Sequence, residues 1–170
     1  PWYSAYTFVG DEMWFYSRAG GDTYDLNRVD AWSLSGTPVL ATPGIPLPWA
    51  LATFGNTIYG VTEWYPNAPT NWAPAVELFA VPTDDPASWS SNQTSMAATP
   101  SFALVPTSVS LFFPVLAGTE GQVWRSTTDM SDGQLALAGQ APTTGFFLAS
   151  SGDNLFWSVQ GGVRSVPLDP

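Results

Sequence analysis

The residues of this chain that could carry out chemistry are almost all carboxylates. Its 170 residues include fourteen Asp and Glu against four Arg, and there is no Lys, His or Cys. Without His there is no Ser-His-Asp triad, and without Lys there is no P-loop or Schiff base. Without Cys or His there is no ordinary zinc or haem site. The reactions left open are those of paired carboxylates, and the remaining metal sites are those of hard cations.

The carboxylates that could form a glycosidase pair are spread along the chain. They are Asp11, Glu12, Asp84, Asp85, Asp129, Asp132 and Asp153. However, Asp11, Asn56 and Asp153 each follow a glycine at the same point of a repeated phrase. Asp and Asn at such a point stabilise hairpin turns by bonding to their own backbone. We therefore expect turn roles for these residues and predict no catalytic residue.

One acidic segment could hold calcium. The stretch GGDTYDLNRVD places Asp22, Asp25 and Asp30 in what is expected to be one inter-strand loop. Three carboxylates with backbone carbonyls could supply the six to eight oxygens that Ca²⁺ needs, although the spacing matches no EF-hand. A solvated loop is the alternative. No cofactor and no transition metal are expected, since carboxylate-only sites suit hard cations.

Tryptophan is abundant, with nine residues. Trp14, Trp32, Trp124 and Trp157 fall on expected strands and should lie in the core. Trp64, Tyr65 and Trp72 fall in the proline-rich stretch EWYPNAPTNWAP at 63–74. These three aromatic residues could pack on their own repeat, form a protein interface or stack on sugar rings. Because loops carry function more often than scaffolds do, this stretch is the predicted contact element.

The elements that must position these residues are short strands. A strand–turn–strand phrase recurs about every 45–50 residues, a period typical of repeat folds. It reads SAYTFVGDEMWFYS at 4–17, WALATFGNTIYGVT at 49–62 and GFFLASSGDNLFWS at 145–158, with a weaker copy, SFALVPTSVSLFFP, at 101–114. Gly10, Gly55 and Gly152 should occupy equivalent hairpin turns. Sixteen prolines and fifteen glycines leave no clean helical period.

These repeats predict an all-β, β-propeller-like fold with four repeats of about 40–50 residues, each a three- to four-stranded antiparallel blade. We expect a single domain over 1–170, with units at about 1–43, 44–99, 100–139 and 140–170. The third strand of the first unit is expected near 28–34. The fourth unit stops after its third strand. Either the N-terminal PWYSA segment supplies the missing strand, or the chain is part of a larger ring or abuts a partner.

Two series of residues should recur in space. Trp14, Tyr59, Phe112 and Phe156 are predicted to be equivalent in the second strands, as are Val29, Leu78, Val123 and Val163 in the third. An aromatic series of this kind could form a stacking platform. Packing between neighbouring blades is the favoured interpretation, because each sheet face must bury its large side chains against the next.

The phrase SGDNLFWSVQGGVRSVPLDP resembles bacterial extracellular β-propeller repeats, and ELFAVPTDDP in the second unit is similar. Those repeats have a turn with Gly or Asp, an aromatic strand, a glycine pair and an arginine-bearing strand ending in Val-Pro. The resemblance covers two units well, the first moderately and the third poorly. It implies a fold and transfers no catalytic residue. The insert at 63–74 departs from the pattern.

Composition limits the partners. The net charge is −10, which argues against nucleic acid and against an anionic membrane surface. Charged residues make up 11% of the chain, against the usual ~25%, and neutral polar residues take their place. This favours an extracellular or periplasmic location. Prolines interrupt the uncharged stretches, so no membrane-spanning segment is expected.

The predicted function is binding rather than catalysis. We expect a secreted or periplasmic structural subunit that holds a protein partner, or joins a larger assembly, through its aromatic and proline-rich loops. The first alternative is a lectin-like propeller that binds carbohydrate. The second is a glycoside-active enzyme that works through two carboxylates.

Overall fold

The computed structural model of this chain describes residues 5–20, 23–33, 36–65, 73–118, 120–130, 136–141, 147–159 and 161–168. They form antiparallel sheets and one short 3-10 turn, η1 (Pro86–Ser88). Within these ranges, no helix has the length and apolar character needed to cross a bilayer.

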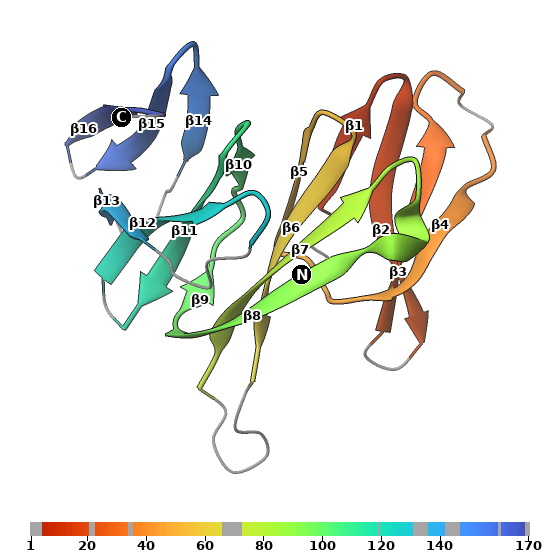
Figure 1. The fold of residues 1–170 in the computed structure, drawn as a ribbon, viewed down its shortest axis with the longest axis horizontal. Coiled ribbons are helices and arrows are strands. Elements are labelled where there is room, and N and C mark those ends of the chain that lie inside the picture. The colour runs from red at the N-terminus through yellow and green to blue at the C-terminus, as the bar shows by residue number, and fades with distance from the viewer. Residues whose placement is uncertain are drawn as a thin grey trace.

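Four sheets follow one another along the chain, and we call them blades one to four (Figure 1). Blade one contains β1 (Tyr6–Val9), β2 (Glu12–Gly20), β3 (Thr23–Asp30) and β4 (Val39–Ile45). Blade two contains β5 (Ala50–Phe54), β6 (Thr57–Trp64), β7 (Ala75–Pro82) and β8 (Ser90–Ala97). In both, the strands lie side by side in chain order.

Blade three contains β9 (Thr99–Pro100), β10 (Val105–Pro106), β11 (Ser110–Ala117), β12 (Glu120–Thr127) and β13 (Ala136–Ala141). Blade four contains β14 (Leu148–Ser151), β15 (Asn154–Val159) and β16 (Gly162–Pro167). The predicted all-β architecture of four antiparallel repeats is confirmed. Three of the sheets have the predicted three or four strands, and the third has five.

The hairpins that open three of the blades are equivalent, as predicted. In each, two residues join the first and second strands, and the glycine comes first: Gly10-Asp11, Gly55-Asn56 and Gly152-Asp153. The three glycines have φ of 56°, 57° and 55°. A positive φ at the first central position is the type II′ signature, and it costs glycine nothing sterically.

Blade three departs from this pattern, which explains the weak repeat there. Its first strand is split into β9 and β10, which both pair with β11. Its hairpin uses hydroxyl chemistry in place of glycine: Thr107 Oγ1 accepts hydrogen bonds from the backbone N–H groups of Ser110 (2.9 Å) and Val109 (3.3 Å). A threonine can stabilise a turn in this way because its side chain replaces a backbone acceptor.

The third strand of blade one lies earlier than predicted. β3 covers Thr23–Asp30 instead of 28–34. Register therefore places Leu26, not Val29, at the position that Leu78, Val123 and Val163 hold in the other blades, since each of these pairs with the fifth residue of a second strand. The predicted third-strand series is wrong for this blade. The earlier end of β3 also leaves Trp32 beyond the strand, and this side chain is 80% exposed rather than in the core.

Among the described residues the core consists of three clusters, one between each pair of consecutive blades. Trp14 and Leu26 of blade one pack with Ile58 and Phe79 of blade two. The other two clusters lie between blades two and three and between blades three and four. Since strand side chains alternate between the two faces of a sheet, blades two and three bury both faces.

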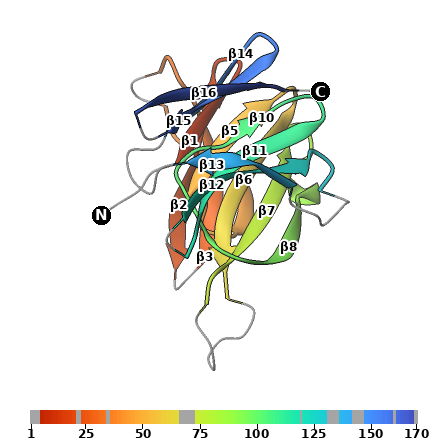
Figure 2. The ribbon, with the colours of Figure 1, turned by 90° about the vertical axis from the view of Figure 1, so that its left-hand side faces the viewer.

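The blades stand in a row. Their first strands contact one another in chain order, β1 with β5, β5 with β10 and β10 with β14. Blades one and four stand at opposite ends of the row in Figure 1, and blade four faces the viewer in Figure 2. The described chain thus has two end faces, one on blade one and one on blade four.

Candidate functional site

The predicted contact stretch begins where β6 ends. The indole N–H of Trp64 donates to the backbone carbonyl of Thr94 in β8 at 3.1 Å, so this ring lies against its own blade. Tyr65 is 36% exposed, and its hydroxyl donates to the Glu63 carboxylate at 2.8 Å. That hydrogen bond, with some desolvation, raises the pKa of Tyr65. Trp72 lies outside the described residues.

The calcium candidates are not gathered in one loop. Asp25 and Asp30 both belong to β3, five residues apart. At ~3.3 Å per strand residue they are about 16 Å apart, too far to share a cation. Asp25 accepts a hydrogen bond from the N–H of Gly44 at 3.4 Å, and Asp30 accepts one from the N–H of Trp32 at 2.9 Å. Asp22 lies outside the described residues, and the described part of the chain contains no acidic cluster suited to a metal.

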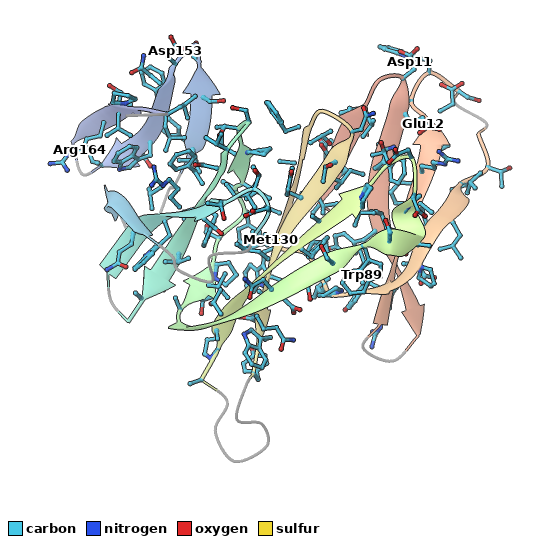
Figure 3. All side chains as sticks on the ribbon, in the orientation of Figure 1. Asp11, Glu12, Trp89, Met130, Asp153 and Arg164 are labelled. Carbon is cyan, nitrogen blue, oxygen red and sulfur yellow. The ribbon has the colours of Figure 1, made fainter. Side chains whose placement is uncertain are left out.

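The turn carboxylates lie at one end of the blades, which we call the hairpin end. Figure 3 shows Asp153 at the tip of blade four and Asp11 at the tip of blade one. Asp11 accepts a hydrogen bond from the indole N–H of Trp32 at 3.1 Å. These two carboxylates stand on opposite ends of the row, so the structure does not pair them across one site.

Two positions in the second strand of each blade define how the blades pack. The second residue is Met13, Ile58, Leu111 or Leu155, and the third is Trp14, Tyr59, Phe112 or Phe156. The third-position aromatic of one blade shares a cluster with the second-position aliphatic of the next. The pairs are Trp14 with Ile58, Tyr59 with Leu111, and Phe112 with Leu155. This supports inter-blade packing for the aromatic series and leaves Met13 and Phe156 unmatched.

Met13 belongs to the end face of blade one. It pairs across the hairpin with Phe8, and Phe15 pairs with Tyr6, so these four side chains share one side of the sheet. Tyr6 and Phe8 are 56% and 53% exposed. Leu40 of β4, paired through Asn27 with Phe15, extends the same side. This face is apolar in composition and partly open to solvent: Tyr6, Phe8 and Leu40 are exposed, and Met13 and Phe15 are partly buried.

Phe156 belongs to the end face of blade four. It pairs with Ala149 on one side and Ser165 on the other. Val163, two residues along β16 from Ser165, lies on the same side and is 58% exposed. The two end faces therefore correspond to the two sides of one repeated interface.

A pocket opens at the hairpin end of the row. Its volume is about 720 Å³, within the ~300–1,000 Å³ typical of small-molecule sites. It lies where the first hairpins of blades two, three and four converge. The lining residues are Thr53, Phe54, Leu104, Val105, Pro106, Thr107, Ser108, Ser150, Gly152, Asp153 and Leu168.

Sequence reasoning found the hairpins but missed this pocket. It assigned Gly152 and Asp153 to a turn, which they form, and the pocket arises only because three turns meet. It also missed Glu77, a carboxylate only 6% exposed, which accepts a hydrogen bond from the side-chain amide of Gln93 at 3.3 Å. The alternation of β7 could have indicated a buried acid there, because the apolar residues Ala75, Phe79 and Val81 share its face of the strand.

Comparison with known proteins identifies the fold only. No protein-family model matches the sequence, and no curated protein matches it. The structure of YjhT matches with a TM-score of 0.56 and 9% identity over 98% of this chain, and the chain spans 65% of that protein's length. Bombyx mori GH32 beta-fructofuranosidase BmSUC1 matches with a TM-score of 0.49 and 8% identity, over 90% of this chain and 39% of that one. The YjhT structure has a β-propeller-type fold, in agreement with the predicted fold class.

Proposed function

We propose that this chain is a non-catalytic structural and binding subunit that joins a second copy of itself head to tail, blade four of one copy on blade one of the next. The observation that carries the proposal is the pair of unmatched positions, Met13 and Phe156. At all three internal junctions these positions pack together in a buried cluster. A second copy would offer each end face the same complementary side chains that the neighbouring blade offers at an internal junction.

The exposed apolar side chains of the two end faces favour a bound partner on each face. In repeat proteins an outer face that no neighbouring repeat covers is usually polar. Here the end faces carry the exposed apolar side chains of Phe8, Tyr6 and Val163. A contact between two different faces is heterologous, so it closes into a ring or continues as a filament. Two copies would supply eight blades, which is within the four to eight typical of propellers.

A complementation experiment tests the proposal. Light scattering and sedimentation should show association that increases with concentration. Phe8→Glu on blade one and Val163→Glu on blade four should each abolish it, because each destroys one of the two faces. Mixing the two variants should restore a one-to-one dimer, since each retains the face that the other lacks.

The matched control is Val39→Glu. Val39 is 54% exposed in the same sheet as Phe8, but it pairs with Arg28 and lies on the other side. It should leave association unchanged. A chain that stays monomeric at all concentrations, or a mixture of the two face variants that does not associate, would overturn the head-to-tail proposal.

We propose the stretch around Trp64, Tyr65 and Trp72 as a second contact with a protein partner. Tyr65 supports this role best, because it is exposed while its hydroxyl is fixed by Glu63. Tyr65→Ala tests it without disturbing the bond from Trp64 to Thr94. The subunit would act in the extracellular or periplasmic space, as its low charge favours, and an export assay of the full gene product tests that location.

A further inference from the structure

The pocket at the hairpin end lies within one copy of the chain, so its role is independent of how copies associate. Three successive blades build it, each through the start of its hairpin. This position on rigid strand ends favours a preformed site.

The charge of the lining restricts the ligand. Among the described lining residues the only ionisable side chain is the Asp153 carboxylate, and none of these residues carries a positive charge. Phosphate, sulfate and carboxylate ligands would meet negative charge without a counter-ion, in a chain whose net charge is −10. The pocket therefore suits a neutral ligand.

Some hydrogen-bonding side chains in the lining already bond within the protein, and others could bond to a ligand. Thr107 Oγ1 is used, since it accepts two backbone N–H groups and donates to the carbonyl of Ser110 at 3.1 Å. The side chains of Ser108, Ser150 and Asp153 are exposed and make no hydrogen bond within the described part of the chain. Two hydroxyls and a carboxylate can together bind the hydroxyl groups of a ligand.

Two lining residues carry side chains that the repeated hairpin itself does not require. Phe54 is 45% exposed, and Val9 and Ser151 hold its place before the turn in blades one and four. Asp153 holds the place of Asn56 in blade two, so the turn does not need a charge. An exposed ring and an exposed carboxylate in the same pocket offer the C–H face of a sugar an aromatic surface and its hydroxyls a strong acceptor.

We propose that this pocket binds a neutral polyhydroxylated ligand of mono- to disaccharide size, with Phe54 stacking on the ring and Ser108, Ser150 and Asp153 bonding its hydroxyls. Among the described residues the lining has a single carboxylate and no second acid for glycoside hydrolysis, so binding without turnover is expected.

Titration of the isotope-labelled chain with a panel of neutral disaccharides tests this, with cellobiose, maltose and lactose as probes and their sulfated forms as the charged comparison. Amide signals of the three hairpins should shift saturably with at least one neutral sugar. Asp153→Asn and Phe54→Ala should each weaken binding by about tenfold or more, as expected when a hydrogen bond to a charged group or a stacking surface is lost.

The control substitutions remove a carboxylate and an aromatic ring that lie outside the pocket. Asp84→Asn removes an exposed carboxylate outside the pocket, and Trp32→Ala removes a ring near blade one that is 80% exposed. Both should leave affinity unchanged, and Asp153→Asn should fold normally because Asn56 occupies the equivalent turn. No saturable shift with any neutral sugar, tighter binding of the sulfated forms, or loss of binding only in Trp32→Ala would overturn the proposal.

Discussion

The inner junctions and the two end faces of this molecule use the same strand positions in different surroundings. Ile58, Leu111 and Leu155 are fully buried against the preceding blade, whereas Met13, at the same position of blade one, has no preceding blade among the described residues. Both settings retain large apolar side chains. The comparison teaches that burial in this fold comes from the neighbouring blade, while residue type comes from the repeat.

Substitution at the second position of the second strand should distinguish an inner junction from an end face most strongly. Ile58→Ala should lower the free energy of unfolding by about 2–5 kcal/mol, because it leaves a cavity between blades one and two. Met13→Ala should change the stability of the monomer by less than about 1 kcal/mol, because Met13 is only partly buried and no described blade covers it. Chemical denaturation of dilute, monomeric samples measures both. Equal losses would mean that blade one is covered in the monomer and would contradict the proposed end face.

Replacing a glycine at an inner junction should destabilise the fold more than replacing a glycine in open surroundings. A Cβ on Gly60 would overlap the ring of Phe79, which pairs directly across from it. Gly60→Ala should therefore destabilise the fold by about 1–3 kcal/mol through overpacking. Gly162→Ala is the control, since a Cβ there meets open space. Thermal unfolding distinguishes them, and Phe79→Leu should partly rescue Gly60→Ala. Tolerance of Gly60→Ala would show that blades one and two are not tightly packed.

The smallest expected effect is a change in the pKa of Tyr65, which directly follows β6. Because Tyr65 donates to Glu63, its pKa is raised above its ordinary value of 10.0, so the folded state holds this proton more tightly than the unfolded state. Its contribution to stability is present below pH 10 and is lost as the pH rises through the raised pKa. Glu63→Gln should lower the pKa of Tyr65 toward its ordinary value. Ultraviolet titration, with Tyr65→Phe to identify the signal, measures this, and an unchanged titration in Glu63→Gln would contradict it.

Local features of this protein could be predicted wherever short-range chemistry decides the structure. Gly10, Gly55 and Gly152 identified their hairpins because few residues tolerate a positive φ there. Trp32 was misplaced because the bounds of β3 depend on its partners: register with β2 ends the strand at Asp30. Beyond the strand, Trp32 bonds to Asp11, twenty-one residues away in sequence.

The sequence by itself determined that this chain forms repeated antiparallel strands, because turn residues and alternating apolar residues act within a few positions of one another. It also excluded His, Lys and Cys chemistry, since those residues are absent. The tertiary structure decided which apolar faces are buried, since burial depends on a blade tens of residues away. It also decided that three turns, each built for its own hairpin, meet around a pocket. No local pattern encodes that meeting, because the twist and stacking of whole sheets bring the turns together.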